Sequence, residues 1–277
     1  MGVLMIALVL AVVWLDDALG EVALGPVTLP PGALLVLLGL AVVALLAREV
    51  AAVARAKGLA VDATMLGLAG AAGLVVTYLG VGVAATALMG AAVLVAALMG
   101  RCVSRRACDG AVATVSMAGF AYIYLGLLPG VLVVIRQEHG GWSLAGAVLV
   151  IKACDIGAYF TGRWLGRHKL IAWLSPGKTW EGLVGGVALA AVVATALAAL
   201  GNAMDRGDWP LVAAATGGAL LGLVGQVGDL VASALKRDAG IKDAGASIPG
   251  FGGVLDVMDS LLIAGVVAWA VLAMVAP

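Results

Sequence analysis

Long apolar segments alternate with short polar ones along almost the whole chain. A helix that crosses a bilayer needs about 20 apolar residues, and nine segments come near that length. Helices are favoured over a β-barrel, because a barrel shows alternating polarity in shorter pieces. The predicted spans are 2–15, 33–54, 64–80, 82–100, 111–134, 142–162, 180–200, 210–235 and 254–276.

Composition strengthens this interpretation, since 64% of the 277 residues are hydrophobic and only 12% are charged. A soluble domain has about 25% charged residues. The sequence therefore predicts an all-α integral membrane protein, a polytopic bundle of about nine transmembrane helices in one membrane domain, 1–277. Residues 1–140 are its N-terminal helices, and 141–277 carry the candidate chemistry. The net charge is zero, so a nucleic-acid partner is not expected.

Lysine and arginine gather in alternate loops. Of the 16 such residues, 13 fall in one set of loops, the other set holds Arg136 and Arg206, and Lys152 lies within a span. Basic loops face the cytoplasm. We therefore expect a multi-pass protein of the cell inner membrane, N-inside and C-outside. The outer loops are 16–32, 134–142 and 201–209.

Two predicted spans contain the charged residues that stand out. Such groups are costly in a bilayer, so they mark a functional site or an ion pair. Lys152 and Asp155 are three residues apart in the span 142–162 and share one helical face, which Tyr159 continues. A structural salt bridge explains this pair as well as a binding site does.

The span 210–235 carries Asp229 and Ser233, and with Lys236 just after it they form one polar stripe that descends to the cytoplasmic end. The next span begins with Asp256 and Asp259, after glycines that allow a ligand to approach the backbone closely. Magnesium is typically held by one or two carboxylates together with phosphate oxygens. The pattern predicts that Asp229 and Asp256 hold Mg²⁺ beside a phosphate. For Asp259, the helix dipole offers an alternative explanation.

The loop 163–181 contains Gly177, Lys178 and Thr179, which resemble the end of a phosphate-binding loop. Such a loop needs a glycine at position 172, where this chain has alanine, so we reject it. Ser175 and Pro176 are instead expected to cap the following helix, with Glu181 in its first turn. Lys178 remains within reach of a phosphate.

The last half of the chain, from Ala145 onward, contains a series of short polar and glycine-rich motifs. They are Asp155 to Tyr159, Gly162–Arg163, Ser175 to Gly182, Gly228 to Leu230, Ser233 to Arg237, Lys242–Asp243, Pro249–Gly250 with Gly252–Gly253, Asp256 and Asp259. Taken together, these motifs resemble the signature of the phosphatidate cytidylyltransferase family. Three residues depart from that signature: Phe251 replaces a histidine, Val257 an arginine and Ala232 a glutamate.

The resemblance implies that CTP and phosphatidate react to give CDP-diacylglycerol and pyrophosphate, with Mg²⁺, at the cytoplasmic membrane face. It also implies a homodimer. The catalytic candidates are Lys178, Lys236, Arg237, Lys242, Asp243 and Asp259, and the metal ligands are Asp229 and Asp256. The substrate-binding candidates are Asp155, Tyr159, Ser175, Thr179, Glu181, Ser233, Gly252 and Gly253.

Two other functions use similar residues. A transporter of an anionic solute also places aspartate and lysine within spans, and it predicts solute flux without nucleotide. Another CTP-dependent lipid phosphotransferase, such as a lipid-alcohol kinase, predicts a lipid phosphate as product in place of a CDP-lipid. A purely structural subunit, in contrast, has no need of acids inside its helices.

Overall fold

The computed structural model describes residues 2–20, 30–242, 245 and 253–275. Within these ranges, six helical segments are long and apolar enough to cross a membrane. The all-α membrane fold is therefore confirmed, whereas the number of nine spans and their orientation remain predictions. The six segments are Ala33–Ala56, Val83–Ser104, Ala111–Leu165, Trp180–Ala203, Leu211–Asp238 and Leu255–Val275.

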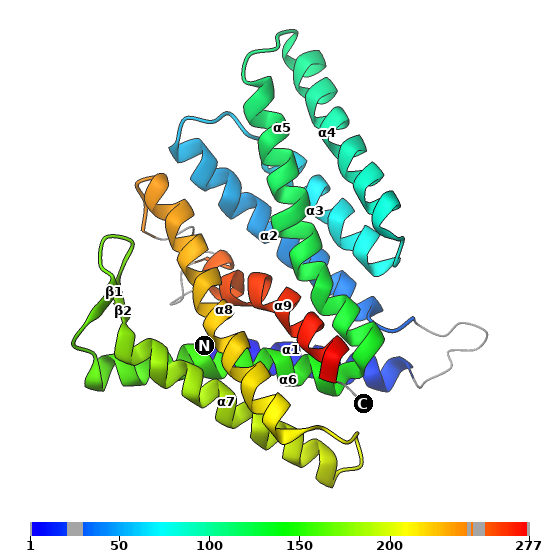
Figure 1. Cartoon of the computed structure of the whole chain (residues 1–277). Helices are drawn as coiled ribbons and strands as arrows, with labels where there is room; N and C mark the ends of the chain where they lie inside the picture. The colour runs from blue at the N-terminus through cyan, green and yellow to red at the C-terminus, as the bar shows by residue number, and fades with distance from the viewer. Residues whose placement is uncertain (1, 21–29, 243–244, 246–252, 276–277) are drawn as a thin grey trace. The chain divides into compact units, whose positions relative to one another are not determined.

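Helices make up most of the described chain, and one short hairpin interrupts them (Figure 1). The elements in order are α1 (Gly2–Gly20), α2 (Ala33–Ala56), α3 (Ala63–Tyr78), α4 (Val83–Arg105), α5 (Ala111–Phe120), the π-helix η1 (Ala121–Leu127), α6 (Leu128–Leu165), β1 (Lys169–Ile171), β2 (Ser175–Thr179), α7 (Trp180–Ala203), α8 (Leu211–Asp238) and α9 (Leu255–Val275).

These elements form two compact units that interleave along the sequence. Unit 1 comprises Met1–Glu21, Ile135–Ala234 and Met258–Pro277, and unit 2 comprises Val22–Val134 and Leu235–Val257. Each unit is described by itself below. The organisation of the chain as one membrane domain remains a prediction.

The predicted loop 134–142 is much shorter than expected, because α6 is helical on both sides of Gly140. The helical segment Ala111–Leu165 has 55 residues, which at about 1.5 Å per residue far exceeds a bilayer core of about 30 Å. Gly140 interrupts it with non-helical angles, φ 79° and ψ 173°. A positive φ of this size is accessible to glycine at little cost. The predicted spans 111–134 and 142–162 lie on the two sides of this break.

Arg136, predicted to lie in that loop, is instead a buried residue of α6. Its guanidinium lies 2.9 Å from Asp16 and 2.6 Å from Asp17. Both acids belong to α1, which extends to Gly20 rather than ending at residue 15. A buried arginine needs such partners, because an unpaired charge in an apolar interior is strongly destabilising.

In unit 2, α2, α3 and η1 pack around Val43, Leu66, Leu74 and Leu125, all of which are at most 1% exposed. Figure 1 shows α4 and α5 side by side as a helical hairpin. Where α3 meets η1, the backbones touch: a Cβ on Gly126 would lie 2.9 Å from the Cα of Gly73 and would also meet a carbonyl oxygen. Small residues permit such close helix contacts in membranes.

Replacing Gly126 with alanine is therefore expected to destabilise unit 2 by about 1–3 kcal/mol, because backbone atoms cannot move aside for the added methyl group. A thermal melt in detergent measures the loss. The matched control is Gly100→Ala in α4, where nothing lies within 4 Å of the new Cβ. Equal melting temperatures for the two variants would contradict the close packing of α3 and η1.

In unit 1, a hairpin separates α6 from α7. Strand β1 pairs antiparallel with β2, with Lys169 opposite Thr179. The predicted cap at Ser175 and Pro176 is wrong, because Ser175 belongs to β2. Thr179 caps α7 instead, since its Oγ1 accepts a hydrogen bond from the Gly182 amide at 3.1 Å. Glu181 lies in the first turn of α7, as predicted.

Candidate active site

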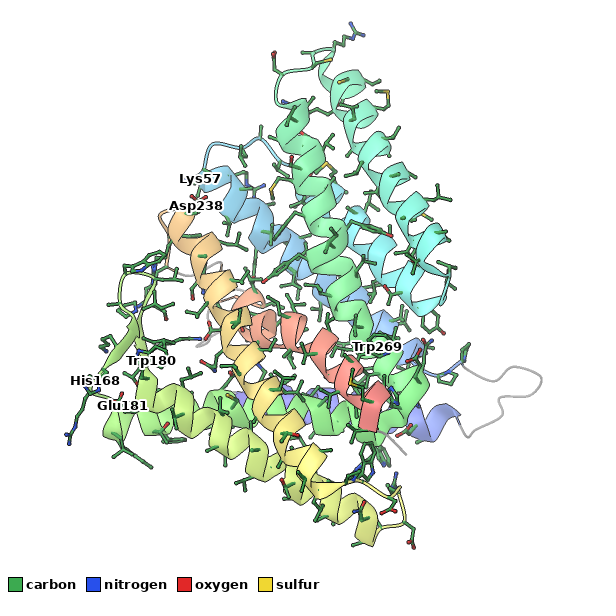
Figure 2. The ribbon with its side chains drawn as sticks, in the orientation of Figure 1. Lys57, His168, Trp180, Glu181, Asp238 and Trp269 are labelled. Atoms are coloured by element: carbon green, nitrogen blue, oxygen red, sulfur yellow. The ribbon has the colours of Figure 1, made fainter. Side chains whose placement is uncertain are left out.

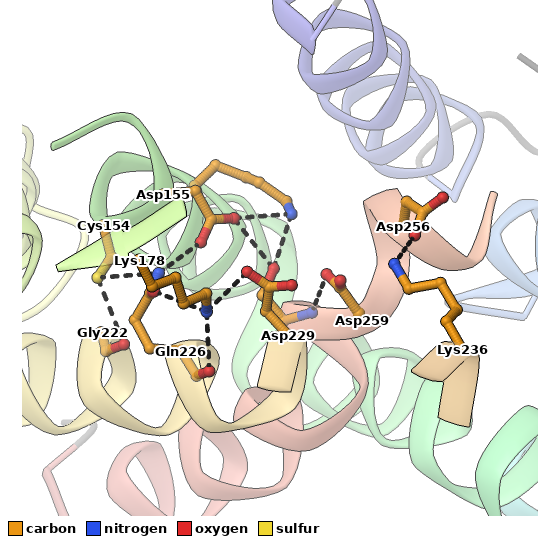
Figure 3. A network of polar contacts seen from close by, with 11 residues as sticks. Cys154, Asp155, Lys178, Gly222, Gln226, Asp229, Lys236, Asp256 and Asp259 are labelled. Atoms are coloured by element: carbon orange, nitrogen blue, oxygen red, sulfur yellow. Dashed lines mark hydrogen bonds and ion pairs between the residues drawn. The ribbon is translucent and has the colours of Figure 1, made fainter. Parts of the chain in front are cut away.

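Unit 1 contains a group of polar side chains within its apolar helices, which we call the polar cluster (Figure 3). Its members come from α6, β2, α8 and α9. They are Lys152, Asp155, Lys178, Gln226, Asp229, Asp259 and Ser260.

Lys152 joins α6 to α9. Its Nζ donates to Asp155 Oδ2 at 3.1 Å and to Ser260 Oγ at 2.8 Å. The Ser260 hydroxyl in turn donates to Asp155 Oδ2 at 3.1 Å. The predicted contact between Lys152 and Asp155 is thus confirmed, and Ser260 was not foreseen. Lys152, Asp155 and Ser260 thus form one hydrogen-bonded network. Its contacts offset the free-energy cost of removing an ammonium and a carboxylate from water.

Lys178 reaches the cluster from β2. Its Nζ lies 2.7 Å from Asp229 Oδ2 and donates to the Gln226 side-chain oxygen at 3.0 Å. The Gln226 amide nitrogen donates to Asp155 Oδ1 at 3.1 Å. The hairpin therefore delivers a mostly buried cation to the acids of α6 and α8 (Figure 3).

Asp259 lies beside Asp229, and the two carboxylates interact directly. Gly228 permits this contact between α8 and α9, because a Cβ there would lie 2.5 Å from the Asp259 carbonyl oxygen. Asp259 is only 4% exposed, and its Oδ1 accepts from the Ser260 amide at 2.6 Å. Two neighbouring carboxylates repel each other unless a proton or cation lies between them.

The charges of the polar cluster suit a divalent cation beside phosphate. Three carboxyl groups, on Asp155, Asp229 and Asp259, lie with two ammonium groups, on Lys152 and Lys178, so the acids outnumber the lysines. Among the described residues, no three His, Cys, Asp or Glu side chains gather closely enough to hold a metal ion. Magnesium does not need three, since it keeps waters and takes phosphate oxygens.

Unit 2 holds the other half of the signature. Lys236 forms an ion pair with Asp256, and both side chains are largely buried. Asp256 Oδ2 also accepts from the Gly253 amide at 3.0 Å. Lys242 is exposed, and an Arg237 nitrogen donates to the Ile241 carbonyl at 3.2 Å. Near them, Lys57 pairs with Asp238 at 2.9 Å (Figure 2).

Glu49 in α2 is a residue that the sequence analysis missed. It is 3% exposed, and its two carboxylate oxygens each accept a hydrogen bond at 2.8 Å, from the amides of Val254 and Leu255. A Cβ on Gly253 would lie 2.9 Å from the Glu49 carboxyl carbon. The glycine is thus needed for the approach of Glu49. The available signal was an acid within the predicted span 33–54. The spans 142–162 and 210–235 are therefore not the only ones whose charged residues matter.

The remaining candidates have local contacts. Tyr159 is exposed, and its hydroxyl accepts from Arg163 at 2.7 Å. The Glu181 carboxylate lies 2.6 Å from the His168 ring (Figure 2). Ser233 is buried in α8. The structure gives Thr179 the capping role described above.

Of the predicted site residues, unit 1 brings together Asp155, Lys178, Asp229 and Asp259, and unit 2 brings together Lys236, Gly253 and Asp256. Asp243 and Gly252 lie outside the described residues, as does Phe251. The two predicted metal ligands, Asp229 and Asp256, belong to different units. Their sharing of one ion remains a prediction.

The sequence of this chain is similar to those of known proteins. The model of a family described as the cytidylyltransferase family matches residues 1–275. A phosphatidate cytidylyltransferase of Brucella suis is 41% identical over 147 residues, which cover 53% of this chain and 51% of that protein. The enzyme of the same name from Haemophilus influenzae is 41% identical over 127 residues (44% and 43%). That of Mycobacterium bovis is 36% identical over 164 residues (58% and 50%). The chain thus spans about half the length of the curated relatives it matches.

Proposed function

The chain belongs to the cytidylyltransferase family, and on that premise we propose that it transfers the cytidylyl group of CTP to phosphatidate. The products are CDP-diacylglycerol and pyrophosphate. The observation that carries the proposal is the polar cluster, which gathers three acids and Lys152 from apolar helices and Lys178 from strand β2. Ionisable groups at such positions are expensive and mark functional sites.

The reaction needs no nucleophile from the protein. An ionised phosphate oxygen of phosphatidate forms a bond to the α-phosphorus of CTP, the bond from that phosphorus to the bridging oxygen breaks, and its electron pair leaves with pyrophosphate. Catalysis then rests on positioning and on neutralising charge. Lys178, Lys236, Arg237 and Lys242 are the proposed phosphate contacts, and Asp155 holds Lys152 and Gln226 in place within the cluster.

We also propose a magnesium requirement, with Asp229 and Asp256 as ligands and Asp259 beside Asp229. The excess of acids over lysines in the polar cluster and the nearness of the Asp229 and Asp259 carboxyl groups support it. When bound, Mg²⁺ supplies positive charge at the oxygens of the leaving pyrophosphate. Lys178 hydrogen-bonds with Gln226 as well as Asp229, so it keeps a partner when it turns toward a phosphate.

The test is CTP turnover by the purified full chain with and without phosphatidate. We expect pyrophosphate release that depends on phosphatidate, and a CDP-lipid as the second product. Formation of a lipid phosphate would favour a CTP-dependent lipid kinase, and solute flux in vesicles without nucleotide use would favour the transporter.

The family resemblance also implies a homodimer, which light scattering in detergent measures.

We expect the N-terminus and the proposed active site to face the cytoplasm of the cell inner membrane, and the C-terminus to lie outside. The asymmetry of 13 loop lysines and arginines against two supports this orientation, because basic loops are retained inside. A C-terminal fusion to a reporter that is active only outside the cytoplasm should give signal, and a fusion after Arg106 should not. A silent C-terminal fusion would show that the predicted number of spans is wrong.

A further inference from the structure

Unit 1 contains a cavity of about 100 Å³ that is separate from the polar cluster. Helices α6, α7, α8 and α9 line it with apolar side chains, and its lining on α6 ends at Val150 and on α8 at Leu221. Toward the polar cluster, the next contact is a hydrogen bond from the Cys154 thiol to the Gly222 carbonyl at 3.3 Å. A lining that is almost entirely apolar favours an apolar ligand.

One wall of the cavity carries a hydrogen-bond donor without an acceptor. Trp209 lines the cavity, and its indole Nε1 is buried with no partner among the described residues. Trp269 shows the usual arrangement, since its Nε1 donates to Glu138 at 2.7 Å. A buried donor that is left unpaired costs free energy, so the Trp209 indole calls for an acceptor from outside the described chain.

The structure fixes Trp209 in this position. Its backbone amide donates to the Asn202 side-chain oxygen at 2.7 Å, and its carbonyl accepts from the Asn202 side-chain nitrogen at 3.0 Å. Nearby, the exposed Arg206 guanidinium lies 5.8 Å from the ring centre of Trp142, which also lines the cavity. The cavity thus combines an apolar interior, a fixed N–H donor and a cation beside Trp142 of its lining.

We propose that the cavity binds one acyl chain of a phospholipid. The part of the hydrocarbon next to its ester occupies the space between the four helices, the Trp209 N–H donates to the ester carbonyl of that chain, and Arg206 attracts the phosphate. Tryptophan is enriched at the level where lipid headgroups and esters lie, so a buried indole N–H in an apolar lining suits the ester of a bound lipid. The site is independent of the proposed cytidylyl transfer, because it shares no residue with the polar cluster.

A comparison of ester and ether lipids distinguishes the proposed site from non-specific hydrophobic binding. The probes are a diacyl phosphatidylglycerol and its dialkyl-ether counterpart, which lacks the carbonyl. Each is added to the delipidated full chain in detergent, and bound lipid is counted by native mass spectrometry. We expect one tight site that prefers the ester lipid by about fivefold, the usual effect of one hydrogen bond. Trp209→Phe keeps an aromatic ring but removes the N–H, and it should bind both lipids equally, at the level of the ether lipid.

A pair of neighbouring alanines tests the cavity itself. Ala198 lines it and is 7% exposed, whereas Ala199 is exposed and lies outside the lining. Ala198→Leu fills the space and should abolish the tight site, and Ala199→Leu should bind as the wild type does. The proposal fails if Trp209→Phe keeps the ester preference or Ala198→Leu keeps the site. It also fails if Ala198→Leu changes only the oligomeric state by light scattering, since a second copy is then the occupant.

Discussion

Replacing Asp229 with asparagine is expected to lower turnover by about three orders of magnitude or more. The substitution keeps the size of the side chain but removes the charge that Lys178 and the proposed Mg²⁺ both need. The fold should survive, because Lys178 retains its hydrogen bonds to Gln226 and Asp259 loses a repulsive neighbour. The measurement is magnesium-dependent pyrophosphate release from CTP and phosphatidate, beside a thermal melt in detergent.

Asp208→Asn is the matched control, because Asp208 is an exposed acid in the loop between α7 and α8. Its turnover should equal that of the wild type. Asp256→Asn should lose turnover to a similar extent as Asp229→Asn. Asp256 also holds Lys236 and the Gly253 amide, so its variant should melt at a lower temperature as well. Near-normal magnesium-dependent rates in both asparagine variants would place the metal elsewhere, and unfolding of both would make the carboxylates structural.

The sequence was most informative where the physical signal is local. Hydropathy located the helices because a span must be both long and apolar. The spacing of Lys152 and Asp155 predicted their contact because residues three apart share a helical face. The signature selected Asp229 and Asp259, which the structure places in one cluster.

Contacts between distant segments were beyond such local reasoning. No spacing rule shows that Lys178 would reach Gln226 or that Ser260 would join Lys152, because these contacts depend on how helices pack. The hairpin β1–β2 was missed for a similar reason. Its strands have only three and five residues, and the stability of so short a pair comes from what it contacts.

Glu49 is the clearest case of a long-range contact, and its replacement should have the second large effect. In Glu49→Ala, the Val254 and Leu255 amides lose their acceptors in a buried setting, which costs about 1–3 kcal/mol for each. These amides begin α9 immediately before Asp256, so turnover should fall together with stability. Glu49→Gln keeps one acceptor oxygen but brings an amide group toward the second N–H. Its melting temperature should therefore lie between those of the wild type and the alanine variant.

Arg48→Gln is the control for this series, because Arg48 is the exposed neighbour of Glu49. Its loss should change neither the melting temperature nor the turnover. Hydrogen exchange on the full chain supplies a measure that does not depend on turnover. The amides of Val254 and Leu255 should exchange faster in Glu49→Ala, while those of α4 should not change. If the alanine variant melts and turns over like the wild type, the start of α9 is held by other contacts. If α4 exchanges faster as well, Glu49 stabilises unit 2 as a whole rather than positioning Asp256.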